Sequence, residues 1–197
     1  LTNKMSKVLT IKEMKKLITN FLTIDEFIKY QNGNLVIDFA DTNKSVDITK
    51  YENTKLFSKL DMSKPEDKEY YFKVVSAFEN FIKFLSDDDV IIDHTYLWDI
   101  ISMPNKYLFP NGVNLVIFQI PDDDITNNVQ ILCPTNHYSS EFYQARKPTI
   151  IIMKKDEYYE PIYLYTTSNK KISVSKEFKE YDPQLSKTMR AVFKEII

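Results

Sequence analysis

Residues 64–85, KPEDKEYYFKVVSAFENFIKFL, carry the clearest structural pattern in this sequence. Apolar side chains recur there every three or four residues, so they form one stripe along a helix. Ser63 is suited to cap this helix, and Pro65 and Glu66 suit its first turn. We therefore predict a long helix whose apolar stripe lies in the protein core. The stripe consists of Tyr71, Val74, Val75, Phe78, Phe81, Ile82 and Leu85.

The residues before this helix predict a smaller helical or irregular region. Residues 10–22 have helical apolar spacing, and Thr10 with Glu13 forms a capping-box pattern at their start. Gly33, between two asparagines, predicts a turn, and residues 34–39 predict a short strand. Residues 41–62 are charged and weakly patterned, so we expect a loop with one short helix. One compact domain is the simplest expectation, with residues 1–60 as an N-terminal helical or irregular lobe and residues 61–197 as the α+β core; a separate helical lobe is the alternative.

The residues after the long helix predict mainly strands. Their apolar runs are short and are separated by turn residues, and a helical pattern starts again at Asp182 and Pro183. The fold class is therefore α+β, with N-terminal helices, a mostly antiparallel sheet of about five strands, and a C-terminal helix. The predicted strands are residues 90–92, 113–120, 129–132, 149–153, 162–166 and 172–174, with a brief helix at 96–101 and a hairpin turn at 154–158.

Composition places the chain among soluble intracellular proteins. It has 197 residues, 43% of them hydrophobic, but no apolar run long enough for a membrane helix and no signal-peptide pattern. Its single cysteine, Cys133, fits a reducing compartment. The net charge is −2, and Arg146 and Arg190 are the only arginines, so we expect no strong nucleic-acid binding. Because the chain starts at Leu1 and ends within a helical pattern, we expect it to be part of a larger protein.

Glycine, histidine and cysteine counts exclude several kinds of chemistry. Only Gly33 and Gly112 are present, whereas phosphate-binding loops need several glycines at fixed spacing. Two histidines and one cysteine cannot form a zinc finger or a zinc protease site. We therefore expect no cofactor and no bound metal of these kinds.

Cys133 and His137 form the first weak candidate site. A thiolate nucleophile needs a base within hydrogen-bonding reach. Cys133 ends a predicted strand and Pro134 directs the chain away, so pairing with His137 is awkward. The alternative is a buried cysteine followed by a surface histidine. Both residues remain candidates for binding.

Two acidic runs, residues 87–89 and 122–124, form the second weak candidate. Clustered carboxylates with Asp93 or Glu79 could hold a divalent cation, as in a metal-dependent nuclease. Aspartates at the ends of helices and strands are also ordinary turn residues. No Glu-x-Lys triplet, which restriction-endonuclease-like enzymes use, occurs on the predicted strands. A nuclease is therefore the alternative function, beside a structural segment of a virion or replication protein.

Residues 92–102, IDHTYLWDIIS, resemble the catalytic start of the ovarian tumour (OTU) family of papain-like deubiquitinases. Asp93, Leu97 and Trp98 match that family's pattern, with Tyr96 at the position of the nucleophilic cysteine. Residues 149–163, TIIIMKKDEYYEPIY, resemble its closing strand and hairpin, with Tyr158 at the position of the catalytic histidine and Tyr159 after it. The motifs DHTYLWDII, LFPNG, DDITNN and CPTNHY also resemble segments of large proteins of mimivirus-like giant DNA viruses.

The resemblance implies a protein that has lost its catalytic pair. In a cysteine–histidine pair, the imidazole takes the thiol proton and the resulting thiolate attacks the substrate. A phenol, with a pKa of about 10, is a poor base and a poor nucleophile at neutral pH. We therefore expect a non-catalytic protein-binding module on an OTU-like scaffold, in the host cytoplasm or a virion. Ubiquitin or a viral protein is the expected partner. Trp98, Tyr159, Cys133 and His137 are the candidate binding residues beside the degenerate positions Asp93, Tyr96 and Tyr158.

Overall fold

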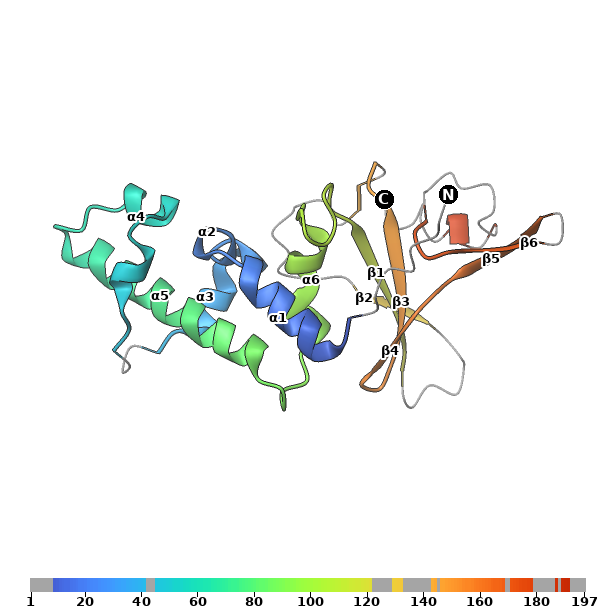
Figure 1. Ribbon diagram of the computed structural model, residues 1–197, viewed down its shortest axis with the longest axis horizontal. Coiled ribbons are helices and arrows are strands. Elements are labelled where there is room, and N and C mark those ends of the chain that lie inside the picture. The colour runs from blue at the N-terminus through green and yellow to red at the C-terminus, as the bar shows by residue number, and fades with distance from the viewer. Residues whose placement is uncertain are drawn as a thin grey trace. The chain divides into compact units, whose positions relative to one another are not determined.

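The computed structural model describes residues 9–41, 45–121, 129–132, 143–144, 146–168, 171–178, 187 and 189–191. These residues form an α+β protein in which helices come first along the chain and strands follow (Figure 1). The chain divides into two compact units, Leu1–Asp93 and His94–Ile197. Within the described residues, no helix combines the length and the apolar character needed to cross a membrane.

Helix α5 (Pro65–Ser86) forms the centre of the first unit. The side chains of Tyr71, Val74 and Phe81 are fully buried, as the stripe predicted. Helices α1 (Ile11–Phe21), α2 (Ile24–Phe27) and α3 (Asn34–Phe39) contact α5 in Figure 1. Burial of their apolar faces against α5 stabilises the unit, since each buried large apolar side chain contributes about 1.5–3 kcal/mol. The remaining elements are η1 (Tyr30–Gly33), η2 (Ile48–Tyr51) and α4 (Lys55–Lys59).

Aromatic rings fill the space between these helices. The ring centroids of Phe27 and Phe81 are 5.2 Å apart, and those of Phe39 and Phe81 are 5.0 Å apart. Tyr51 meets Phe78 edge to face at 5.7 Å. Tilted and edge-to-face pairs at these distances are favourable beyond the area that they bury. These aromatic rings therefore form much of the core of the helical unit.

The predicted N-terminal and long helices are confirmed. Thr10 and Glu13 form the predicted capping box at the start of α1. The predicted cap of α5 was wrong, because Lys64 occupies that position without a side-chain hydrogen bond. The Ser63 hydroxyl instead donates to Asp61 Oδ1 at 2.6 Å.

Two predicted strands of the first unit were wrong. Residues 34–39 form α3, which follows Gly33 at a φ of 88° and buries Leu35 and Val36. A short apolar run does not distinguish a strand from a helical turn, and packing against α5 selects the helix here. Residues 90–92 form no strand. The Val90 carbonyl oxygen instead accepts a hydrogen bond from the Lys15 ammonium at 2.7 Å.

The boundary between the units lies after Asp93, whereas the sequence suggested residue 60. The reason is α5, which packs on α1, α2 and α3 and thereby joins the N-terminal helices. Residues 61–93 therefore belong to the helical unit, and the strands belong to the other one.

The second unit contains a four-stranded sheet in the order β2-β1-β3-β4. Its central strands, β1 (Asn114–Ile120) and β3 (Thr149–Lys155), are parallel, with Val116 opposite Ile151. Strand β2 (Gln130–Leu132) pairs antiparallel with β1, and β4 (Tyr158–Pro161) pairs antiparallel with β3. A separate antiparallel pair contains β5 (Leu164–Ser168) and β6 (Lys171–Ser175). Most pairings of the described strands are thus antiparallel, as predicted, but they form two sheets.

The central strands of the four-stranded sheet carry an apolar cluster on each face, because successive side chains of a strand point in opposite directions. Helix α6 (His94–Ser102) covers one face, where Trp98 packs against Leu115 and Ile117. The other face carries a second cluster. We call it the Phe118 cluster; it contains Val116, Phe118, Tyr143, Ile151 and Phe178.

The predicted hairpin turn is confirmed, with Asp156 at a φ of 52°, but the strand that follows it, β4, was missed. Of the predicted C-terminal helix, residues 187 and 189–191 are described and helical. Met189 packs against the Phe118 cluster. The rest of that predicted helix lies outside the described residues.

Candidate functional site

Trp98, a predicted binding residue, lies in the core. Its ring is 4% exposed, between α6 and strands β1 and β3. The large side chain therefore anchors the helix to the sheet and is not presented to a partner. Trp98, one of the residues on which the resemblance of residues 92–102 to a catalytic motif rests, therefore has a packing role here.

Tyr158 and Tyr159 face opposite sides of the sheet. Tyr159 lies opposite Lys154 and shares the face that α6 covers, whereas Tyr158 lies opposite Lys155 on the other face. Tyr158 is 76% exposed. The pleat of the strand therefore directs Tyr158 and Tyr159 to opposite faces, although the sequence pattern assigned both to one candidate site.

The contact between α6 and β4 is made by His94 and Tyr159. The His94 Nδ1 atom lies 2.9 Å from the Tyr159 hydroxyl, and the two ring centroids are 5.9 Å apart. The Lys154 ammonium lies 5.9 Å from the centre of the Tyr159 ring, within cation–π range. His94 also contacts Trp98, four residues later on the same helix. This cluster ties the first turn of α6 to the edge of the sheet.

Sequence reasoning gave His94 no role. An imidazole can accept or donate a proton near neutral pH, and a neighbouring phenol can orient it. The one usable signal was the spacing of His94 and Trp98, which places both rings on one side of a helix. The partner Tyr159, 65 residues away, follows only from the tertiary structure.

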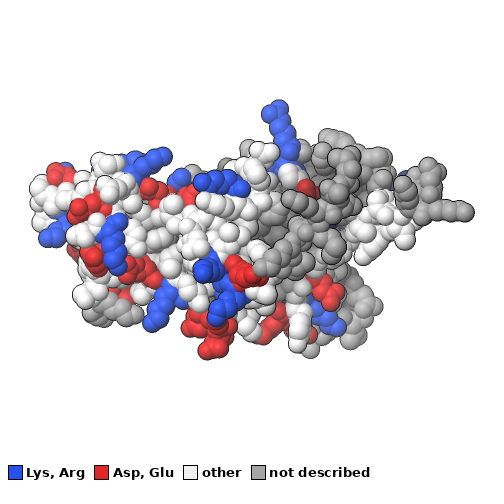
Figure 2. Space-filling model, viewed as in Figure 1, with Lys and Arg blue, Asp and Glu red and all other residues white. Residues whose placement is uncertain are grey.

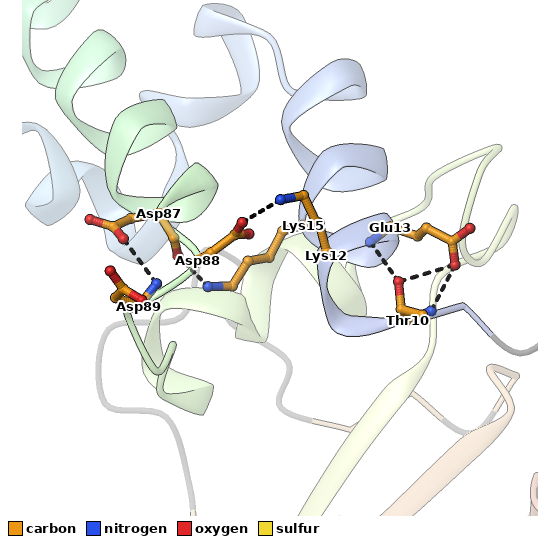
Figure 3. Close-up of polar contacts among 7 residues, drawn as sticks. All are labelled: Thr10, Lys12, Glu13, Lys15, Asp87, Asp88 and Asp89. Carbon is orange, nitrogen blue, oxygen red and sulfur yellow. Dashed lines mark hydrogen bonds and ion pairs between the residues drawn. The ribbon is translucent and has the colours of Figure 1, made fainter.

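The acidic run at the end of α5 is held by two lysines of α1 (Figure 3). The Lys12 ammonium lies 2.5 Å from Asp88 Oδ2, and that hydrogen bond lowers the pKa of Asp88 and raises the pKa of Lys12. The buried Lys15 ammonium donates to the carbonyl oxygens of Asp87 and Val90. The Asp88 carboxylate is therefore paired with the Lys12 side chain, and Lys15 binds the backbone of the same segment. Among the residues that the structure describes, no group of three or more His, Cys, Asp or Glu side chains could hold a metal ion.

Glu79, the other predicted carboxylate, belongs to the helical unit. Its Oε1 atom accepts from the Tyr51 hydroxyl at 3.3 Å and lies 3.6 Å from the Lys50 ammonium. Burial, reinforced by the Glu79 charge, raises the pKa of Tyr51 to about 12. This arrangement supports helix packing. Cys133, His137 and residues 122–124 lie outside the described residues.

On the face of the molecule drawn in Figure 2, the described residues form no large patch of one charge. There, the described Lys and Arg side chains of the helical unit are intermixed with Asp and Glu. A continuous basic track, which a phosphate backbone would favour, is not seen among the described residues on that face.

The β5–β6 hairpin carries an unusual distribution of side chains. Pairing places Tyr165 opposite Val174 and Thr167 opposite Ile172, so these side chains share one face. Tyr163, directly before β5, extends this face, since its ring centroid lies 6.5 Å from that of Tyr165. The apolar residues here are exposed: Tyr163 by 43%, Tyr165 by 66%, Ile172 by 72% and Val174 by 55%. We call these four residues the ribbon face.

The opposite face of the hairpin is mostly hydroxylic. Thr166 and Ser173 lie opposite each other there, with their hydroxyls 2.5 Å apart. Leu164, on that side, packs against the Phe118 cluster and attaches the hairpin to the unit. A soluble ribbon normally turns its apolar face inward and its polar face to water. This hairpin does the reverse over most of its length.

Comparison with known proteins finds no matching family model, no matching curated protein and no matching solved structure.

Proposed function

We propose that this chain is a non-catalytic protein-binding module that binds a partner through the ribbon face. The observation that carries the proposal is the exposure of Tyr163, Tyr165, Ile172 and Val174 on one side of the β5–β6 hairpin. Contiguous exposed apolar side chains mark interaction surfaces, since leaving them in water is unfavourable. Tyrosine in particular is enriched at protein interfaces.

The partner that fits this face is an extended segment of another protein. A two-stranded hairpin is marginally stable alone, and its edges offer backbone groups to a further strand. Figure 1 shows β5 and β6 extending beyond the four-stranded sheet. A strand added to such an edge gains main-chain hydrogen bonds, while alternate side chains meet the apolar face. Because the ribbon face bears no charge, the added segment should present uncharged apolar residues at every second position.

Binding of a peptide that copies β5 tests this proposal. The probe is a fluorescent peptide with the sequence of residues 163–168, YLYTTS, carrying a short Gly-Lys tail for solubility. We expect its anisotropy to rise saturably with the intact chain. The double variant Tyr165→Ser/Val174→Ser should bind at least about tenfold more weakly, since each buried apolar side chain contributes more than the 1.4 kcal/mol that a tenfold change requires.

Two controls make the test specific. Ile11→Ser/Ile37→Ser removes two apolar side chains of the helical unit that are at least as exposed as Val174, and it should leave binding unchanged. A peptide with serine at both tyrosine positions should lose affinity for the intact chain. Absence of saturable binding at millimolar concentration, or an equal loss in both double variants, would overturn the proposal.

A further inference from the structure

The β3–β4 hairpin carries a surface cavity that is separate from the ribbon face and from the His94 cluster. Its volume is about 330 Å³. It lies on the face of the four-stranded sheet that α6 does not cover, because the pleat directs Met153, Tyr158 and Glu160 to that face. The lining residues are Ile120, Met153, Lys155, Asp156, Tyr158 and Glu160.

Strand register explains how this lining forms. Lys155 lies opposite both Ile120 on β1 and Tyr158 on β4, while Met153 lies opposite Glu160. Asp156 occupies the left-handed turn position that closes the hairpin. The cavity therefore has a half-buried apolar floor, Ile120 and Met153, and a rim that combines a phenol ring with charged groups.

The charges of the rim favour a cation. Asp156 and Glu160 supply two carboxylates against the single ammonium of Lys155. Within the described residues, the Glu160 side chain forms no hydrogen bond or ion pair, so its carboxylate is open to a ligand. The face of an exposed tyrosine ring attracts cations as well, and guanidinium also stacks on such a ring.

We propose that this cavity binds an organic cation with an aliphatic stem, such as the arginine side chain of a peptide. The methylene groups would lie on Ile120 and Met153, and the guanidinium would lie between Glu160 and the Tyr158 ring. A volume near 300 Å³ is at the lower end of small-ligand sites and suits one such side chain. Lys155 opposes the ligand charge, so the site binds weakly and its affinity rises when that lysine is neutralised.

Titration of the intact, ¹⁵N-labelled chain with Nα-acetyl-arginine methylamide tests the site. We expect saturable shifts of the amides of Met153 and residues 155–160. Glu160→Gln should weaken binding and Lys155→Gln should strengthen it, each by about two- to fivefold, the size of an exposed charge interaction. Glu157→Gln is the matched control, since Glu157 lies in the same turn but does not line the cavity. It should change the affinity least of the three.

Three comparisons of affinity would each overturn the proposal. The first is equal binding of Nα-acetyl-norleucine methylamide, which would show an apolar cleft without cation recognition. The second is preferential binding of the corresponding glutamate derivative, which would show that Lys155 dominates. The third is an equal loss of affinity in Glu157→Gln and Glu160→Gln, which would show that the effect comes from the net charge of the hairpin and not from the cavity. Absence of any shift at a probe concentration on the order of 50 mM would also exclude the site.

Discussion

The Nζ atom of Lys15 lies 2.7 Å from the carbonyl oxygen of Val90, although 75 residues separate them along the chain. The same ammonium donates to the carbonyl oxygen of Asp87, the C-cap residue that follows α5. Carbonyl groups at a helix end lack partners within the helix and need them from elsewhere. A lysine of α1 thus caps the segment that follows α5. With only 8% of its surface exposed, Lys15 makes these bonds away from bulk water.

Replacing Lys15 by methionine should destabilise the helical unit. Lys15→Met keeps much of the side-chain volume but removes the ammonium that donates to the Val90 carbonyl oxygen and one of the two donors to the Asp87 carbonyl oxygen, which still accepts from the Val90 N–H. Hydrogen bonds from a charged donor contribute about 1.5–3 kcal/mol, and the partial exposure of Asp87 and Val90 places the loss near the lower end of that range. Urea unfolding, followed by helical circular dichroism, should show this loss. Lys16→Met is the control, because Lys16 is an exposed neighbour on the same helix. Its effect should stay within about 0.5 kcal/mol, and equal effects of both substitutions would refute the capping role.

Removal of the Tyr159 hydroxyl should loosen the start of α6. Tyr159→Phe keeps the ring but removes the hydrogen bond to His94, a change that costs about 0.5–1.5 kcal/mol. Amide hydrogen exchange in the first turn of α6 should therefore become faster. Tyr158→Phe makes the same chemical change on the opposite face of the sheet. It should leave that exchange unchanged, and an acceleration by both substitutions would contradict the assignment of the two faces.

Helices with strong periodicity were predictable from sequence, and this has a physical reason. In α5, apolar side chains from Tyr71 to Leu85 keep helical spacing over several turns, which no strand can accommodate. Residues 34–39 are too few to show a period, so tertiary packing decides their structure. Strand β4 contains Glu160 and Pro161, which suit a turn, and its pairing with β3 selects the extended form.

The candidate sites were less predictable because they depend on contacts between distant residues. Sequence placed Tyr158 and Tyr159 correctly near a hairpin, but the face of each side chain depends on the strand register. The parallel pairing of β1 and β3, strands that are not consecutive in the sequence, is likewise not specified by local patterns. The acidic run at Asp88 looked like a cation site. Only the fold shows that Lys12 of α1 reaches it.

Substitution of Gly112 should be far more costly than substitution of Gly33. Both glycines have positive φ, 73° and 88°, which costs an L-residue about 1–2 kcal/mol. A Cβ atom on Gly112 would in addition lie 2.5 Å from the Ser102 carbonyl oxygen, whereas on Gly33 the nearest atom is 3.5 Å away. We expect Gly33→Ala to lower the stability only by the cost of a positive φ, about 1–2 kcal/mol. Gly112→Ala should cost about 2–5 kcal/mol, because overpacking adds to it. Thermal unfolding of both variants checks this order, and a smaller loss for Gly112→Ala would contradict it.

Stability at alkaline pH should depend on Tyr51. Burial and the Glu79 carboxylate raise its pKa from 10.0 to about 12, so the fold favours the neutral phenol. A raised pKa in the folded state gives stability that is complete below the unfolded value and is lost as pH rises through the folded value. The loss should therefore develop between pH 10 and about 12.

Urea unfolding at pH 9 and above pH 11 should reveal this dependence as a difference between variants. Tyr51→Phe has no ionisable hydroxyl, so it should lose less stability over that interval than the parent chain. Some alkaline loss should persist in it, because burial also raises the pKa of Tyr71. Tyr70→Phe, at a position 44% exposed on α5, is the matched control and should follow the parent. If Tyr51→Phe and Tyr70→Phe follow the same pH dependence, the Tyr51–Glu79 contact does not govern alkaline stability.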